Sequence, residues 1–335
     1  MASKKFRFQS TRTVGHWQAV GLLLALLLSR PILATPIDAI VAAISQPSYT
    51  QYVQDLQNFG TRYYSTTGNA NALTYIYDAF YGFGLNVSYD TFSYGGTYKN
   101  VVATLPGKTH PEKIYIVGAH MDSTSDQAAA TNAPGADDNA SGMAAVMEMA
   151  RTLVNWAFDA TIKFIGFNAE EQHLHGSQAY VADAIANHEN IVGMLNFDMI
   201  AYAQAGQPKS VYLAGDTALV NALDSNALEY TSLQTVKNYA NVYGSDHYYF
   251  HSSLLPGSSS AFAIEAAPEI VRTYNPNYHK ITDTTAYLDF AYATDIVRMG
   301  VATVAELAGA IPEPATIFCF LTGLALLVYR PIRAR

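Results

Sequence analysis

The segment that decides the fold runs from residue 114 to residue 154 and reads IYIVGAHMDSTSDQAAATNAPGADDNASGMAAVMEMARTLV. Its start, Ile114–Gly118, is an apolar run with β-branched side chains, which is typical of a buried strand. Its end, Ser141–Val154, places methionine, alanine and valine side chains at helical spacing, which predicts a helix with one apolar face. A strand followed by a loop and a helix is the building unit of α/β folds.

The same alternation of strands and helices continues on both sides of this segment. Strands are predicted at Asn100–Leu105, Thr161–Phe167, Ile191–Phe197, Ser210–Leu213 and Ala261–Ile264, and helices at Asn69–Phe83, Gly176–Ala186, Thr217–Tyr230 and Tyr287–Ala310. This pattern predicts a three-layer αβα fold, with a mainly parallel twisted sheet and helices on both faces. We expect residues 36–309 to form one such domain. The chain has 335 residues, of which 50% are apolar and 14% are charged, so an intrinsically disordered chain is excluded.

Acidic and imidazole side chains gather where the predicted strands end. They are His120 and Asp122, Glu170 and Glu171, Asp198, and the pair Asp137 and Asp138 on the loop before the helix at Ser141. Ligands of open α/β sheets bind beyond the carboxyl ends of the strands. So many carboxylates on one rim repel each other strongly unless a cation neutralises them. The sequence therefore predicts a divalent metal site with two ions, in preference to a solvated acidic rim.

Several local sequences resemble peptidase family M28, a family of di-zinc aminopeptidases. They are Thr61–Ser65, Gly118–Ser123, Gly135–Gly142, Asn168–Glu171, Asn196–Ile200, Gly244–His247, Tyr274–His279 and Asp283-Thr284. The resemblance covers roughly residues 50–308. It implies a zinc-exopeptidase-like fold and an enzyme that hydrolyses N-terminal residues from peptides with the help of two divalent metal ions, Zn²⁺.

The resemblance implies five metal ligands, which are His120, Asp138, Glu171, Asp198 and His279. Asp138 would bridge the two ions, and it is preferred to Asp137 because it stands three residues before Ser141. His120 and Asp198 would complete one metal site, and Glu171 and His279 would complete the other. Imidazole and carboxylate ligands with open positions are typical of catalytic zinc.

The resemblance also implies the catalytic groups. Glu170 would act as the general base toward a metal-bridging hydroxide and would pass the proton to the leaving amine. Asp122, two residues after His120, would orient that imidazole. An aromatic side chain near Tyr243 is the candidate donor to the oxyanion, and the Asp138–Asn139 peptide bond is expected to be cis.

Candidates for the substrate side-chain pocket lie close to these motifs. They are Met199, Ile200, Tyr202, Tyr278 and Phe250, and for each of them ordinary packing in the core or at the rim is the alternative. His173 and His175 are interpreted as rim or surface histidines rather than further metal ligands, because the set of five is already complete.

Both end segments carry patterns typical of export signals. Residues 1–34 combine a basic region with the apolar run Ala19–Leu28 and a small residue at Ala34, which predicts a signal peptide, with an uncleaved anchor as the alternative. Residues 311–335 hold a Pro-Glu-Pro motif, an apolar stretch and an arginine-bearing tail, and they resemble the PEP-CTERM sorting signal. This resemblance implies export to the cell envelope or the medium and an exosortase-type partner. A permanent transmembrane anchor is the alternative.

Composition and motifs exclude several other classes of protein. Between the two end segments, 11 Lys or Arg stand against 26 Asp or Glu, which makes a poor surface for nucleic acid. The sequence has neither a His-Glu-x-x-His pair nor a Gly-x-Ser-x-Gly elbow. The leading interpretation is an exported metalloaminopeptidase that acts on peptides or proteins with a free N-terminus. The alternatives are a carboxypeptidase or glutaminyl cyclase of the same fold, and a non-catalytic surface-displayed protein.

Overall fold

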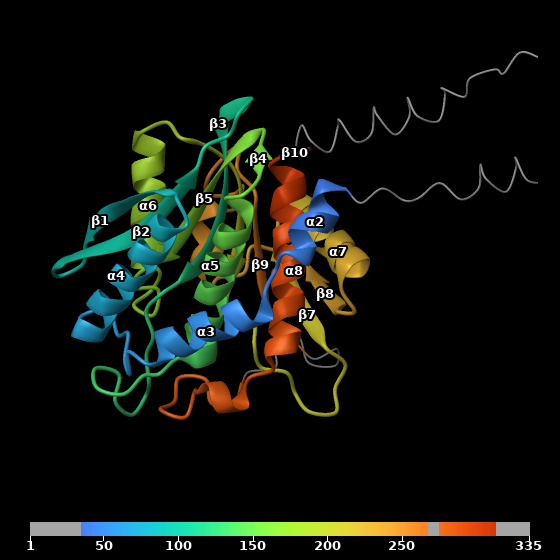
Figure 1. The fold of residues 1–335 in the computed structure, drawn as a ribbon. Helices are drawn as coiled ribbons and strands as arrows, with labels where there is room; N and C mark the ends of the chain where they lie inside the picture. Colours follow the sequence, from blue (N-terminus) through green and yellow to red (C-terminus); the bar gives the residue numbers. More distant parts are fainter. Residues whose placement is uncertain (1–34, 267–274, 313–335) are drawn as a thin grey trace, which may run out of the picture. The chain divides into compact units, whose positions relative to one another are not determined.

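The computed structural model describes residues 35–266 and 275–312. Its centre is an eight-stranded sheet (Figure 1). The strands are β1 (Asn86–Ser93), β2 (Thr97–Leu105), β3 (His110–His120), β5 (Ala160–Phe167), β6 (Asn190–Phe197), β7 (Ser210–Gly215), β8 (Gln234–Asn238) and β9 (Ser260–Ala266). Their order is β1-β2-β5-β3-β6-β9-β7-β8. The four central strands β5, β3, β6 and β9 are parallel to one another, and β2 and β7 flank them in the antiparallel direction. A separate pair joins β4 (Ala157–Phe158) to β10 (Ala310–Ile311).

Helices cover both faces of this sheet. They are α2 (Pro36–Ala42), α3 (Gln46–Gln57), α4 (Thr67–Gly82), α5 (Gly142–Leu153), α6 (His175–Ala186), α7 (Thr217–Tyr230) and α8 (Phe290–Leu307). All of them except α6 contribute to the larger hydrophobic core, whereas α6 packs with the opposite face of the sheet in a second, smaller core (Figure 1). The predicted three-layer αβα fold is therefore confirmed.

The position of β3 at the centre of the parallel strands brings the predicted site residues together. Gly118 of β3 pairs with Ile165 of β5 on one side and with Asn196 of β6 on the other. The three strands therefore end side by side, and the residues that follow them share one edge of the sheet. A side chain at Gly118 would be too large here, since its Cβ would lie 2.7 Å from the Phe167 ring.

The structure also contains elements that the hydrophobic pattern did not predict. Strands β1 and β8 lie at the two edges of the sheet, and most of their side chains are exposed or half-buried, so they lack an apolar run. The last helix is shorter than Tyr287–Ala310, because the Asp289 carboxylate accepts the Tyr292 N–H and caps α8 at its start. After Leu307 the chain leaves the helix and pairs with β4.

Of the predicted end segments, residues 1–34 and 313–335 lie outside the described residues. Every described element belongs to the second of two units, which divide after Thr35. Within residues 35–266 and 275–312, none of the helices combines the length and the apolar character that crossing a bilayer requires.

Candidate metal centre

The structure brings all five predicted metal ligands together at the carboxyl edge of the central strands, with Asp138 between two imidazoles. Its Oδ1 lies 3.3 Å from Nε2 of His120, and its Oδ2 lies 3.3 Å from Nε2 of His279. His120 Nε2 is also 3.3 Å from Asp198 Oδ1, and His279 Nε2 is 2.9 Å from Glu171 Oε2. The five side chains thus form two groups of donor atoms that share the Asp138 carboxylate.

These distances fit the spacing of donor atoms around a zinc ion. Two ligands at 2.0–2.2 Å from a tetrahedral ion lie about 3.4 Å apart. The donor set is nitrogen and oxygen only, which suits zinc and several other divalent metals. In addition, Oε1 of Glu171 is buried and has no hydrogen-bond partner among the described residues. A buried carboxylate oxygen without a partner is costly, so the residues present fit a bound cation.

Glu170 also faces the first group of donors, at a greater distance. Its Oε2 lies 4.0 Å from His120 Nε2, and Glu170, His120 and Asp198 could by themselves surround an ion. The shorter distances from His120 to Asp138 and Asp198 favour those two carboxylates as partners of the imidazole. Glu170 is therefore the more distant carboxylate of this group.

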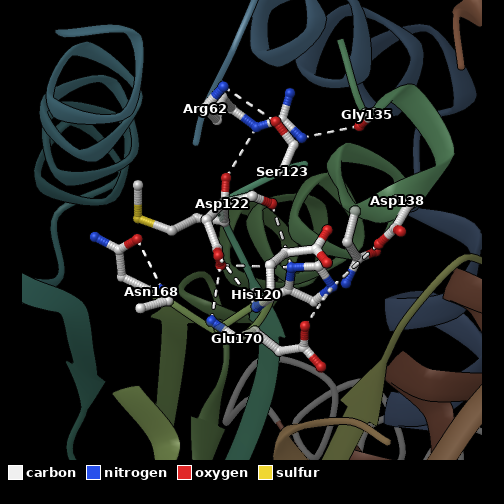
Figure 2. Close-up of polar contacts among 12 residues, drawn as sticks. Arg62, His120, Asp122, Ser123, Gly135, Asp138, Asn168 and Glu170 are labelled. Carbon is white, nitrogen blue, oxygen red and sulfur yellow. Dashed lines mark hydrogen bonds and ion pairs between the residues drawn. The ribbon is translucent and has the colours of Figure 1, made fainter. Parts of the chain in front are cut away.

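Asp122 contacts both His120 and the backbone at Glu170 and Glu171. It faces Nδ1 of His120 through its carboxylate at 3.6 Å and its main-chain oxygen at 3.2 Å, so that Nε2 points into the site. The same carboxylate accepts the N–H groups of Glu170 and Glu171 (Figure 2). Asp122 is fully buried, and its position agrees with the orienting role that the sequence predicted for it.

Buried polar groups fix the backbone around Asp138. Its N–H group donates to the carboxylate of Asp283 at 3.0 Å. Asn139 donates from Nδ2 to the Phe197 carbonyl and accepts the Met199 N–H group, so it ties this turn, η1 (Ala136–Ser141), to the end of β6. The Asp138–Asn139 peptide bond is cis, as predicted.

Three residues support the site in ways that the sequence did not indicate. The Ser245 hydroxyl donates to Asp198 Oδ2 at 2.7 Å and accepts from Asn196 Nδ2, which fixes the orientation of Asp198. Arg62 is almost fully buried and donates to the carbonyl oxygens of Met121 and Gly135, so it joins the two loops that carry His120 and Asp138 (Figure 2). Ser245, Arg62 and Asp283 all lie in the matched motifs, but only the folded chain shows which groups they contact.

The surroundings of His120, Glu170 and Glu171 raise the pKa of each group and so favour its protonated form. Burial lowers the pKa of His120, but the carboxylates of Glu170 and Asp198 more than offset this effect and raise it well above its ordinary value. Burial, together with the charge of Asp138, raises the pKa of Glu171 to about 7. Burial raises the pKa of Glu170 well above its ordinary value, and the charges of Glu171 and Asp198 act in the same direction.

A cavity of about 130 Å³ opens onto these residues. Four carboxylates and two imidazoles line one part of it, and none of its described lining residues is Lys or Arg. Met199, Ile264 and Tyr278 form the apolar part of the lining, so the structure places two of the predicted pocket residues, Met199 and Tyr278, at the cavity.

The other candidates for the pocket do not line this cavity, and for Ile200 and Phe250 the alternative of ordinary packing in the core applies. Ile200 is fully buried in the larger core, and Phe250 packs against Phe167 in the smaller core. Tyr202 is half-buried and is held by its main-chain N–H, which donates to Glu265. Tyr243, the candidate oxyanion donor, is 54% exposed and contacts Tyr248, while its neighbour Gly244 lines the cavity.

The chain is similar in sequence and in fold to known peptidases. A sequence model of peptidase family M28 matches residues 100–304. The chain is 29% identical over 292 residues to leucine aminopeptidase 1 of Paracoccidioides brasiliensis. The aligned region covers 81% of this chain and 73% of that protein. Its fold is similar to that of the Legionella pneumophila LapA aminopeptidase, with a TM-score of 0.72, 22% identity, and coverage of 86% of this chain and 80% of that chain. It is also similar in fold to a zinc aminopeptidase from Bacillus subtilis, with a TM-score of 0.68, 18% identity, and coverage of 79% and 96%.

Proposed function

Because the chain belongs to peptidase family M28 and is a metalloaminopeptidase, we propose that it removes single N-terminal residues from peptides with two zinc ions at one site. His120 and Asp198 would hold one ion, Glu171 and His279 would hold the other, and Asp138 would bridge them. The observation that carries this proposal is the position of the Asp138 carboxylate, whose two oxygens each lie 3.3 Å from a different imidazole. When bound, the ions would polarise the scissile carbonyl and lower the pKa of water.

The residues of the chain supply the proton transfer and the alignment. Glu170 would accept the proton of the attacking water and donate it to the amine that leaves. Its carboxylate lies beside the first group of donors, with Oε2 4.0 Å from His120 Nε2. Asp122 would fix the positions of Glu170 and His120 relative to each other, since it contacts the backbone of Glu170 and the imidazole of His120.

The cavity supports an exopeptidase with a preference for apolar N-terminal residues. A volume of about 130 Å³ has room for about one side chain, and its apolar part consists of Met199, Ile264 and Tyr278. The carboxylates beside it would receive the free α-amino group of the substrate. Together with the leucine aminopeptidases among the relatives, this lining favours leucine and similar residues as the first residue of the substrate.

Metal removal tests the proposed function. We expect a chelator to lower kcat/KM for leucyl p-nitroanilide by about 100-fold or more, because Lewis-acid stabilisation contributes several kcal/mol. Two equivalents of zinc should restore the activity, as measured by titration against the metal-free protein. Peptides with a blocked N-terminus serve as the control and should not be cleaved. The proposal would be overturned if the chelated protein kept its full rate, or if the zinc-loaded protein acted only on blocked peptides or only cyclised N-terminal glutamine.

We further propose that the enzyme works outside the cytoplasm, on the basis of the two end segments. Residues 1–34 have the composition of a signal peptide, and residues 311–335 combine the Pro-Glu-Pro motif with an apolar stretch and three arginines. Mass spectrometry of the protein from fractionated cells should find an N-terminus at Thr35 and a C-terminus near Pro314 in the envelope or the medium. Recovery of the intact chain from the cytoplasm would contradict export.

A further inference from the structure

A row of aromatic side chains runs from Tyr63, the residue after Arg62, to the tip of the β1–β2 hairpin. We call it the aromatic row and define it as Tyr63, Tyr64, Tyr94, Tyr98 and His175. The ring centroid of Tyr64 lies 4.8 Å from that of Tyr63, 5.2 Å from that of Tyr98 and 5.6 Å from that of Tyr94. Tyr94 stacks on His175 at 3.8 Å. All five side chains are half-buried, so part of each ring remains open to a ligand.

A cleft of about 340 Å³ opens beside this row. Its lining includes Tyr64 and Tyr98 of the aromatic row, Leu73 of α4, and the amides of Asn69 and Asn168. Lys99 is the only charged side chain among its described lining residues. The two amides are buried and donate to each other, so they form the floor of the cleft. The cleft therefore offers aromatic faces and one positive charge, a combination that suits an uncharged or acidic peptide segment.

The cleft and the row are continuous with the metal centre through the chain and through hydrogen bonds. Asn168 lines the cleft, and it stands two residues before Glu170. The row starts at Tyr63, directly after Arg62, whose N–H donates to Ser123 and whose carbonyl accepts the Ser123 N–H. Ser123 in turn follows Asp122, so the backbone that leads into the row pairs with the loop that carries Asp122.

The order of the strands gives the direction in which a substrate would leave the site. The apolar wall of the metal-site cavity contains Met199, which follows β6, and Ile264 of β9. Glu170 follows β5, on the other side of β3. Beyond β5 come β2 and β1, whose hairpin carries Tyr94 and Tyr98. If Glu170 protonates the leaving amine, as the proposed function has it, the peptide downstream of that amine would continue on the β5 side of the site, toward β2 and the aromatic row.

We propose that the aromatic row and its cleft bind the residues downstream of the scissile bond, so that the enzyme prefers longer peptides to short aminoacyl compounds. This inference rests on the proposed aminopeptidase function. Tyrosine rings would pack against apolar and aromatic side chains of the substrate. Lys99 would favour substrates with neutral or acidic downstream residues over those with basic ones.

The test compares substrate lengths in one protein. Leucyl p-nitroanilide and the hexapeptide Leu-Ala-Phe-Ala-Phe-Ala share the first residue and differ only in the downstream part. For the double variant Tyr64→Ala/Tyr98→Ala we expect the ratio of kcat/KM for the hexapeptide to kcat/KM for the short reporter to fall by about tenfold, mainly through KM. Tyr64→Leu/Tyr98→Leu, which keeps apolar bulk, should recover part of the ratio. Tyr81→Ala is the matched control, since Tyr81 lies on α4 and is 69% exposed outside the row.

The outcomes separate this inference from the proposed function. An unchanged ratio in the double variant, with both substrates still cleaved, would overturn the downstream subsite and leave the aminopeptidase function intact. A wild-type protein that cleaves neither substrate would overturn the proposed function, and the inference with it. A ratio that falls equally in Tyr81→Ala would also overturn the subsite, because the effect would then not depend on the row.

Discussion

Replacing Glu170 by glutamine is expected to lower kcat on leucyl p-nitroanilide by about 10²- to 10⁴-fold, the usual contribution of a general base. The amide keeps the shape and the main-chain contact with Asp122 but cannot accept a proton. Glu170 lies 4.0 Å from His120 Nε2, whereas Asp138 and Asp198 lie 3.3 Å away. Zinc content should therefore remain at two equivalents, and KM should change little.

Metal analysis of the purified variant decides between the two roles that Glu170 could have. The control is Glu229→Gln, an exposed carboxylate on α7 with the same change of charge, which should keep the wild-type rate. Loss of an equivalent of zinc from Glu170→Gln would identify Glu170 as a ligand of the His120 and Asp198 group. A wild-type kcat would remove Glu170 from the mechanism altogether.

The sequence predicted the parallel centre of the fold because those strands are buried on both faces and read as continuous apolar runs. The predicted strand at Thr161–Phe167 and helix at Thr217–Tyr230 agree with β5 and α7 to within one residue. The edge strands β1 and β8 were not predicted. Their side chains are mostly open to solvent, so no apolar pattern marks them, and only pairing with a neighbouring strand makes them strands.

The same distinction applies to the site. His120 ends β3 and Asp198 directly follows β6, while the other ligands stand in recognisable motifs of turns and loops, and the fold brings all five together. Ser245 contacts Asp198, which lies 47 residues earlier in the chain, and the pairing of Asp283 with the Asp138 backbone spans 145 residues. Ile200 was a candidate for the pocket with core packing as the alternative, and its side chain lies in the core. Proximity in the sequence did not determine which side of the chain faces the cavity, because the backbone turns at Met199, where φ is 52°.

The substitution Asp138→Asn is expected to have the broadest effect, since it acts on both metal sites at once. The amide has one oxygen in place of two, so it can serve only one of the positions that now face His120 and His279. It also removes a negative charge from the centre of the site. We expect at most one zinc equivalent per chain, and a kcat/KM lower by about 10³-fold or more. Metal analysis after dialysis and rates with added zinc measure the two effects.

The control for this variant is Asp126→Asn, which removes the same charge from an exposed position on the loop between His120 and Asp138. It should keep two zinc equivalents and the wild-type rate. If Asp138→Asn also kept both, the carboxylate would not bridge the ions, and the two groups of donors would be independent sites. Loss of one ion with loss of nearly all activity is the expected result. It would mean that catalysis needs both halves of the site, because Asp138 is the only one of the five predicted ligands that faces both imidazoles.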